Sequence, residues 1–458
     1  MKQPTHLETP PVLSKEECAA LFERIQAVAK SSGVSDVEAI IGAHREALTR
    51  FANNTIHQNV AEQMQWLSVR VQLDQKTARA TTNRFDADSI RAAVEQSIAL
   101  AKAAAPNPDL LPLAKPSTIP ETPRFDAAAA DADPMDRAKA VAEAIRLVEG
   151  AGQTAAGIYS NGQSVEAIFN SQGVAAWHGE TMANFSITAM AETSSGWAKG
   201  SSVARGAMHP VELARRASDK ARLSSDPREI APGRYTVVLE PAAVLDLVGQ
   251  MFGDFSATAM EDQRSFLTDR LGTKLFGGNI NIYDDVAHPL QAGAPFDGEG
   301  VPRRKLTLVD AGVPRDLAYG RASAHRKGVE PTGHGFPLPN EIGEAPMNIV
   351  IAGGATPLEE MIASTEYGIL VTRLWYIREV DPFPKIMTGM TRDGTFLIEN
   401  GKVVQGLKNF RFNQGIIELL SNVEALSPVV RATGEEAFDM VVPAMKVNDF
   451  NFTEVTRF

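Results

Sequence analysis

Six prolines between residues 106 and 123 divide the chain into two parts of different character. They stand at positions 106, 108, 112, 116, 120 and 123. Proline fixes φ and lacks an amide donor, so such a segment forms neither a helix nor an interior strand and must run extended. An Ala- and Asp-rich stretch follows, and we place a linker over 106–132. With 458 residues the chain also exceeds what one hydrophobic core usually supports, which indicates two or three domains.

The part before the linker, residues 1–105, carries helix and strand signals of an α+β module. Ser14 and Glu17 form a capping box that predicts the start of a helix, and Gly33 predicts its end. Alternating apolar residues over 67–73 predict a half-buried strand, preceded by a turn at 53–54. A second helix is expected over 86–103.

The part after the linker, residues 133–228, repeats this order. Helices are expected over 136–148 and 210–223. Between them the sequence predicts short strands around Ile158, Ile168 and Val174, punctuated by Asn161 and Gly162, and a strand around Phe185. A duplicated α+β module is therefore an open possibility, although the two parts share no evident sequence identity.

From residue 229 to the end, short apolar segments alternate with Gly and Pro. These segments are 235–239, 305–309, 347–352, 368–377 and 395–398. Asp393 with Gly394, and Asn400 with Gly401, are predicted as type I′ hairpin turns. The spacing predicts a large, mainly antiparallel, curved sheet with few helices over 229–458. The expected fold class is α+β, with N-terminal α/β modules followed by this β-rich domain.

Charge and composition exclude several classes of protein. The net charge of -11 repels phosphate backbones, so nucleic acid is not an expected partner. Cys18 is the only cysteine, which excludes an intramolecular disulfide and a thiolate cluster. No apolar run approaches the ~18 residues of a membrane span, and no signal-peptide pattern opens the sequence. We expect a cytoplasmic protein without a membrane partner.

The helix predicted over 241–252 can be explained entirely by packing. Its apolar residues Val244, Leu247, Val248 and Met251 follow helical spacing. Asp246 and Gln250 lie one turn apart on a polar stripe, and Asp246 is expected to be a surface carboxylate.

Three residues in two later loops are further candidates for chemistry. Asp297 and Glu299 stand in a glycine-flanked acidic turn, and His334 stands in the loop TGHG. The ordinary interpretation of His334 is a turn or packing residue. The histidines offer no pair at the i, i+4 spacing of a helical metal site. A metal held by His325, His334 and Glu359 stays open as an alternative.

Several motifs, in this order, resemble the TldD/PmbA family. FANNTIHQN at 51–59 and TTNRFD at 81–86 resemble its N-terminal signatures. The segment 295–328, which begins PFDGEGVP, resembles the central one and is followed by PTGHG at 331–335. DGTFLIENGKVVQGLKNFRF at 393–412 resembles the late strand-turn-strand. The resemblance covers most of the chain.

This resemblance implies a two-domain α+β protein that dimerises around a peptide-holding cavity. The peptidase branch carries HExxxH on the helix after the strand at 235–239, and here those positions run from Leu245 and Asp246 to Gln250. The cysteine ligand expected near the chain's end is also missing from 423–458. Histidines five apart need a bulge or bend in the helix to reach one metal, and we expect no such bend here. The chain resembles the PmbA or TldE branch, which lacks the motif.

Three functions follow as expectations. The first is a non-catalytic subunit that forms a dimer with an HExxxH-bearing, TldD-type relative and helps to hold an unfolded peptide; zinc is then expected only in that partner. The second is a homodimeric hydrolase or metallopeptidase with a non-standard site using Asp246, Asp297, Glu299 or His334. The third is a regulatory binding scaffold, including the DNA-gyrase modulator role associated with the family. Whether the chain is itself an enzyme stays open.

Overall fold

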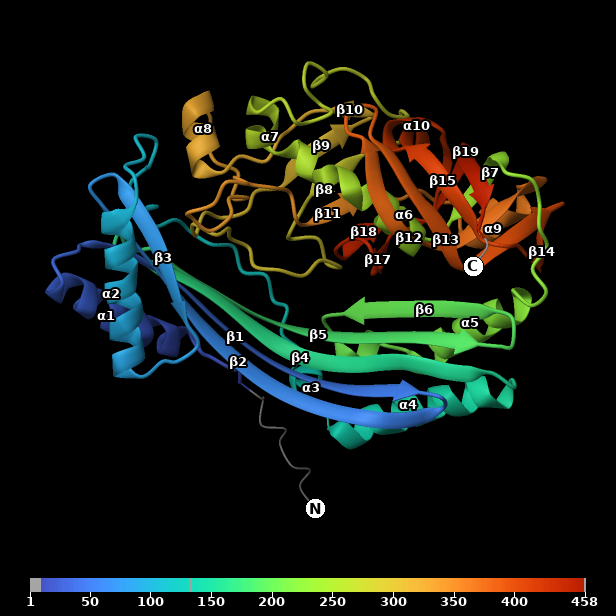
Figure 1. Cartoon of the computed structure of the whole chain (residues 1–458), viewed down its shortest axis with the longest axis horizontal. Coiled ribbons are helices and arrows are strands. Elements are labelled where there is room, and N and C mark those ends of the chain that lie inside the picture. Colours follow the sequence, from blue (N-terminus) through green and yellow to red (C-terminus); the bar gives the residue numbers. More distant parts are fainter. Residues whose placement is uncertain (1–9, 132, 457–458) are drawn as a thin grey trace.

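The computed structural model describes residues 10–131 and 133–456 and has two layers (Figure 1). A long six-stranded sheet forms the N-terminal layer, and the β-rich C-terminal part lies over one of its faces. The α+β class expected from the sequence is confirmed.

The N-terminal sheet has the strand order β3-β2-β1-β4-β5-β6. Its strands are β1 (Asp36–Ala52), β2 (Thr55–Leu73), β3 (Lys76–Thr82), β4 (Thr154–Asn170), β5 (Ala175–Met190) and β6 (Ser195–Ser202). All of its neighbouring strands are antiparallel, and β1 and β4 join the two modules in the middle. The two modules therefore share one sheet, and the domain limits drawn from the sequence stay a prediction.

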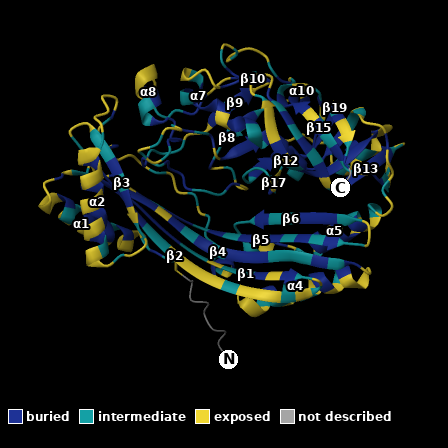
Figure 2. Cartoon of the chain, in the orientation of Figure 1, coloured by how far each residue is buried: buried dark blue, intermediate teal, exposed yellow. Residues whose placement is uncertain are grey.

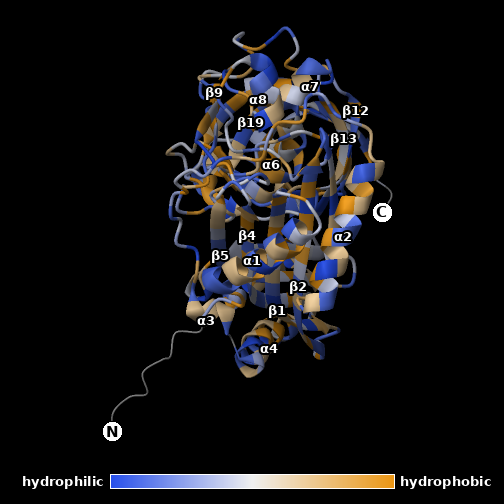
Figure 3. Cartoon of the chain, turned by 90° about the vertical axis from the view of Figure 1, so that its left-hand side faces the viewer, coloured by the Kyte–Doolittle hydropathy of each residue, from blue (hydrophilic) through white to orange (hydrophobic). Residues whose placement is uncertain are grey.

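Each half of this sheet has the same element order, a helix followed by three strands and a second helix. The helices are α1 (Lys15–Ser31) and α2 (Ala87–Ala103) in the first half, and α4 (Pro134–Gly150) and α5 (Pro210–Leu223) in the second. All four helices pack against the same face of the sheet. On β4, this face carries the odd-numbered residues. In Figure 3, α2 and α4 each carry both hydrophobic and hydrophilic residues, as expected for helices that bury one side.

Local signals explain where these elements begin and end. The predicted capping box is present, with Ser14 accepting from the amide of Glu17 and Glu17 accepting from that of Ser14. Asn53 and Asn54 have φ values of 52° and 58° in the β1–β2 turn, as predicted. The short strands expected around Ile158 and Ile168 form one continuous strand, β4. The break expected at Asn161 and Gly162 was wrong, because both residues lie inside β4 and are paired on both sides.

The proline-rich segment packs against the rest of the protein. Residues 104–126 form neither helix nor strand apart from a bridge at Arg124, and the short helix α3 (Ala127–Ala130) and the 3-10 turn η1 (Arg205–Ala207) lie nearby in space. Leu113 and Ala114 are buried. Arg321 of the C-terminal part donates to the carbonyl oxygen of Pro112 at 2.6 Å, so the segment is fixed between the layers.

The C-terminal part contains two sheets where the sequence suggested one. The larger sheet closes into a barrel, because β12 pairs with both β7 and β13. It contains β7 (Gly233–Leu239), β12 (Tyr367–Asp381), β13 (Ile386–Glu399), β14 (Lys402–Gly406), β15 (Phe410–Gly415), β16 (Val423–Leu426) and β19 (Met445–Val455). The smaller contains β8 (Ile282–Asp284), β9 (Leu306–Asp310), β10 (Val313–Pro314), β11 (Ile349–Ile351), β17 (Val430–Ala432) and β18 (Met440–Val442).

Short helices fill and cover these sheets. They are α6 (Pro241–Val248), η2 (Gly249–Phe255), α7 (Ala257–Glu261), α8 (Arg321–Lys327), α9 (Leu358–Ala363) and α10 (Ile416–Ser421). The largest hydrophobic cluster of the described chain lies between the two sheets and includes α6 (Figure 2).

One of the two predicted late turns is confirmed and the other is wrong. Asn400 and Gly401, with φ of 50° and 75°, connect β13 to β14. Asp393 and Gly394 instead form a bulge inside β13. The bulge points the Asp393 carboxylate at the guanidinium of Arg373 and the hydroxyl of Ser195 in the N-terminal sheet. A long-range ion pair therefore decides the conformation of a dipeptide that resembles a hairpin turn.

A buried ion-pair cluster joins the two layers at the other end of the sheet. Glu38 is fully buried and accepts from Arg70 at 2.6 and 2.9 Å and from Arg79 at 2.7 Å. Arg79 also donates to the carbonyl oxygen of Leu338 in the C-terminal part. Burial alone would raise the pKa of Glu38, but the charges and hydrogen bonds of both arginines outweigh it and lower that pKa.

Glu38→Gln should destabilise the protein by roughly 3 to 5 kcal/mol, because it leaves buried guanidinium charge without its counter-ion. Since the folded pKa of Glu38 is lowered, its contribution is complete above the ordinary glutamate pKa and declines as pH falls through the folded value. Urea unfolding at neutral and acidic pH measures both effects. Glu46→Gln, at an exposed position of the same strand, is the control, and equal stabilities of the two variants would contradict the assignment.

Candidate functional site

Helix α6 occupies the position at which the sequence motif begins, directly after strand β7. Pro241 stands in its first turn, where a missing amide donor costs nothing. The predicted apolar stripe is confirmed, since Val244, Leu247 and Val248 are fully buried. On the polar stripe, Asp246 has no exposed surface and Gln250 is half-buried. The expectation of a surface carboxylate was therefore wrong.

Residues 433–439, here called the covering loop, bury this side of α6. Oδ1 of Asp246 accepts hydrogen bonds from the backbone amides of Glu435 and Glu436, each at 3.0 Å. Nε2 of Gln250 donates to the carbonyl oxygen of Glu436 at 3.0 Å and to that of Asp246 at 3.1 Å. The three positions that correspond to the histidines and glutamate of HExxxH are Leu245, Asp246 and Gln250. Two of them, Asp246 and Gln250, thus bind the loop directly.

The covering loop and α6 lie so close together that two positions have no room for a Cβ atom, Gly434 on the loop and Gly249 at the end of α6. A Cβ atom on Gly434 would lie 2.2 Å from Oδ1 of Asp246 and 2.6 Å from a methyl carbon of Leu245. A Cβ on Gly249 would lie 2.5 Å from that of Ala437. The third motif position, Leu245, therefore also packs against the loop.

The helix tightens at this contact. After Val248 the α-helix gives way to the 3-10 helix η2. We expected no bulge or bend here, and the change of helix type at this point was not predicted. The change falls at Gly249, which lies directly against Ala437 of the covering loop, so packing against the loop is sufficient to account for it.

Burial raises the pKa of Asp246 to about 6, against the lowering effect of the two loop amides. Its second oxygen, Oδ2, is buried and has no hydrogen-bond partner within the described residues. The carboxylate is therefore kept in an environment that favours its neutral form in mildly acidic solution.

The residues present do not fit a zinc ion at the motif. Leu245 has no donor atom, the carboxylate of Asp246 is engaged by the loop amides, and Gln250 offers an amide in place of an imidazole. In the parts of the chain that the structure describes, no group of three His, Cys, Asp or Glu side chains is placed to hold a metal. His334 is buried, whereas His325 and Glu359 are exposed on helices at opposite ends of the C-terminal part (Figure 1).

His334 lies in an arrangement that resembles a catalytic triad but is enclosed. Its Nε2 is 3.0 Å from Oδ1 of Asp284, and its Nδ1 is 2.9 Å from Oγ1 of Thr332. The side chains of His334 and Asp284 have no exposed surface. The hydroxyl of Thr332 is 3.0 Å from the carbonyl oxygen of Tyr319. A substrate cannot reach this group, which lies enclosed between the loop 332–335 and strand β8.

Asp297 and Glu299 are structural as well. The carboxylate of Asp297 accepts from the amides of Glu299, Val301 and Gly335 at 2.9 Å each. Glu299 forms an ion pair with Arg321 at 2.8 Å. Burial raises the pKa of both carboxyl groups. The acidic turn predicted from the sequence is therefore a buried junction between loops.

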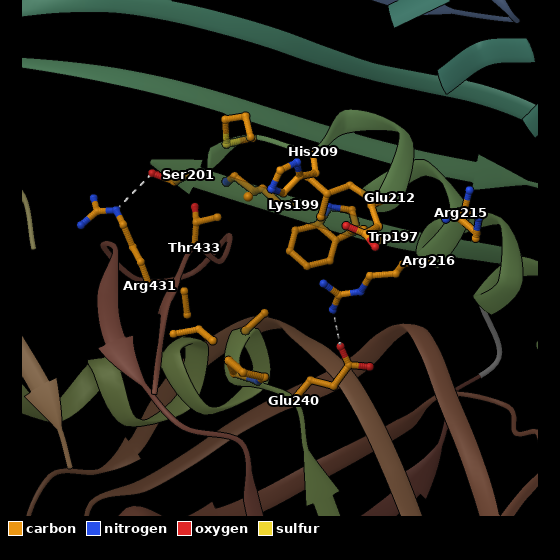
Figure 4. Close-up of a pocket in the computed structure, with 18 of the residues that line it drawn as sticks. Trp197, Lys199, Ser201, His209, Glu212, Arg215, Arg216, Glu240, Arg431 and Thr433 are labelled. Carbon is orange, nitrogen blue, oxygen red and sulfur yellow. Dashed lines mark hydrogen bonds and ion pairs between the residues drawn. The ribbon is translucent and has the colours of Figure 1, made fainter. Parts of the chain in front are cut away.

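Sequence reasoning missed a cavity of about 600 Å³ that lies between the two layers (Figure 4). It is lined by residues of β6, α5, the first turn of α6 and the segment 430–433. Glu240, just before α6, is buried in its wall and lies 2.8 Å from Nζ of Lys220 and 3.5 Å from Arg216. The cavity is thus adjacent to the motif helix but is built from residues far apart in sequence.

Comparisons with known proteins identify the family of the chain. Three family models match, described as PmbA/TldA metallopeptidase domain 1 (residues 37–101), central domain (120–224) and C-terminal domain (232–454). Together they span most of the chain. The chain belongs to the TldD/PmbA family, as its motifs indicated.

Similar proteins support the same grouping. A metalloprotease of Methanothermobacter thermautotrophicus is 25% identical over 225 residues, 47% of each chain. The chain spans about half or less of the length of the first curated relatives it matches. The crystal structure of TldE from Thermococcus kodakarensis aligns with a TM-score of 0.84 and 20% identity, covering 94% of this chain and 100% of that one. A candidate modulator of a DNA gyrase from Thermotoga maritima aligns with a TM-score of 0.83 and 20% identity, covering 95% and 100%.

Asp246→Asn should change how stability depends on pH. Because burial raises the folded pKa of Asp246 to about 6 from 3.8, its contribution to stability is complete below about pH 4 and is lost as pH rises toward about 6. The asparagine variant lacks this titration. Relative to the variant, the unfolding free energy of the wild type should fall by up to about 3 kcal/mol across that interval, measured by urea unfolding.

The control is Asp88→Asn, which removes an exposed carboxylate in the first turn of α2. A stability difference between wild type and Asp246→Asn that stays constant from about pH 4 to about pH 7 would show that Asp246 is not held in the buried contact described above.

Proposed function

We propose that this chain is a non-catalytic, TldE/PmbA-like subunit that pairs with an HExxxH-bearing, TldD-type relative and helps to hold an unfolded peptide for it. The observation that carries the proposal is the contact between α6 and the covering loop. Where the peptidase branch places its metal ligands, this chain has a leucine, a carboxylate engaged by loop amides, and a glutamine that binds the same loop. Zinc and its bound water then belong to the partner.

An open strand edge supports pairing with a second subunit. Strand β3 pairs with β2 only from Leu67 to Leu73, so residues 55–66 of β2 are paired on one side alone. Most of these residues are exposed. An edge of this length presents unpaired amide and carbonyl groups to a partner strand. We assign the subunit contact to this edge.

A hydrolase that uses its own residues has weaker support. Its candidates Asp297, Glu299 and His334 are all buried in loop contacts, and Asp246 faces the covering loop. A purely regulatory scaffold rests on the description of one structural relative as a candidate modulator of a DNA gyrase. No side-chain arrangement described above favours it over the subunit role.

Co-expression with an HExxxH-bearing relative should yield a stable complex that contains zinc and cleaves unstructured peptides. This chain alone should bind no stoichiometric zinc and cleave nothing, because α6 offers no ligand set. Affinity purification, elemental analysis and a peptide-cleavage assay measure the three properties.

The matched control replaces the glutamate of the partner's HExxxH with glutamine, which should leave the complex intact and abolish cleavage. Chelator-insensitive cleavage by this chain alone, or tightly bound zinc in it, would contradict the proposal.

A further inference from the structure

A row of four residues crosses the N-terminal sheet on the face that carries no helices. Trp66, Gly42, Glu166 and His178 lie opposite one another in the neighbouring strands β2, β1, β4 and β5. Directly opposite residues of antiparallel strands point to the same face of a sheet. The helices pack against the odd-numbered residues of β4, so this row lies on the other side, which faces the C-terminal part.

A loop of the C-terminal part reaches the sheet beside this row. Ile168, two residues from Glu166 on the same face of β4, belongs to one hydrophobic cluster with Ala294 and Phe296. Arg303 donates through Nε to the carbonyl oxygens of these two loop residues, each at 3.2 Å. The guanidinium therefore lies at the same contact, and its charge affects the pKa of Glu166 more than any other neighbouring charge does.

Three polar side chains at this place keep atoms that bind no other residue. Glu166 is exposed and has no hydrogen bond or ion pair within the described residues. His178 is buried, and its Nε2 has no hydrogen-bond partner in the described chain; it lies 3.5 Å from Oε2 of Glu180. Nη1 of Arg303 is also buried and without a hydrogen bond to the part of the chain described. Since buried polar atoms are nearly always hydrogen-bonded, this arrangement indicates a place where a polar molecule binds.

An aromatic ring borders the free carboxylate. The indole of Trp66 lies over Gly42, because a Cβ atom on this glycine would lie 1.9 Å from a ring carbon. Gly42 is directly opposite Glu166. Burial raises the pKa of the Glu166 carboxyl, against the lowering effect of Arg303, so a second cation would favour its charged form. An ammonium group suits this position, since it is attracted both to a carboxylate and to the face of an indole.

A hollow of about 290 Å³ lies next to the row on the same face. It begins at His44 and Ser164, which oppose each other two residues beyond Gly42 and Glu166. The other side chains that line it are mostly polar and include Glu46, Ser160, Met182 and Asn184. The hollow therefore offers space and hydrogen-bonding groups for a small polar side chain.

We infer that this row binds an α-ammonium group together with the oxygen of the adjacent carbonyl or carboxylate. Glu166 and Trp66 receive the ammonium, Arg303 and His178 face the oxygen, and the side chain on the same carbon enters the hollow. A free α-amino acid and the N-terminus of a peptide both present these groups. The inference goes beyond the subunit role proposed above and does not depend on it.

Isothermal titration calorimetry with the full chain tests the ligand. L-asparagine or the tripeptide amide Asn-Ala-Ala-NH₂ should bind. N-acetyl-L-asparagine lacks the ammonium and 3-aminopropanamide lacks the α-carboxylate, so each should bind at least tenfold more weakly than L-asparagine or the tripeptide. Tighter binding of L-asparagine than of the tripeptide assigns the site to free amino acids, and the reverse assigns it to peptide N-termini. Binding of neither would overturn the inference.

Variants of the chain test the same contacts. Glu166→Gln should weaken binding of L-asparagine at least tenfold and leave binding of N-acetyl-L-asparagine unchanged, because only the first carries the ammonium. Trp66→Leu should weaken binding about threefold, whereas Trp66→Phe, which keeps an aromatic face, should retain most of it. Thermal unfolding checks that each variant is folded.

The matched control is Glu23→Gln. It removes an exposed carboxylate from α1, which packs against the opposite face of the sheet, and binding should be unchanged. Equal affinity of Glu166→Gln and wild type for L-asparagine and the tripeptide, or equal affinity of wild type for L-asparagine and its N-acetyl derivative, would contradict the assignment.

Discussion

The buried contact between the Asp246 carboxylate and the amides of Glu435 and Glu436 is the interaction on which the rest of this structure depends. Burying a carboxylate that makes no hydrogen bonds costs more free energy than one or two hydrogen bonds usually contribute to stability. Asp246 and the covering loop therefore fix each other, and the glycines at 249 and 434 let their backbones approach. The same contact covers the side of α6 on which Asp246 and Gln250 lie.

Charged groups also set how the two layers meet. At one end Glu38, Arg70 and Arg79 reach from the N-terminal sheet to the loop at Leu338. At the other end Asp393 joins Ser195 to Arg373, whose guanidinium lies 4.9 Å from the ring centre of Trp197. The residues of β6 and β17 also contact each other, through Arg431 and Ser201, beside the cavity that both strands line. The interface therefore holds the layers together at both ends of the N-terminal sheet.

Features encoded by neighbouring residues could be predicted from the sequence. The capping box at Ser14 and the turn at Asn400 depend on local backbone geometry, and both are present. Predictions failed where distant residues decide: Asp246 is buried by a loop almost 190 residues further along the chain, and the Asp393–Gly394 bulge is set by Arg373 and Ser195. The pairing of His334 with Asp284 and the cavity between the layers arise only in the folded chain, because no local spacing encodes either.

The most direct test of the covering-loop contact is amide hydrogen exchange, measured by NMR or mass spectrometry with and without excess zinc. If Asp246 holds the loop, the amides of Glu435 and Glu436 will exchange as slowly as those of the β-barrel core, and zinc will leave their rates unchanged. Rapid exchange of these amides, or zinc-dependent rates across residues 433–439, would show that the face of α6 is open and able to bind a metal.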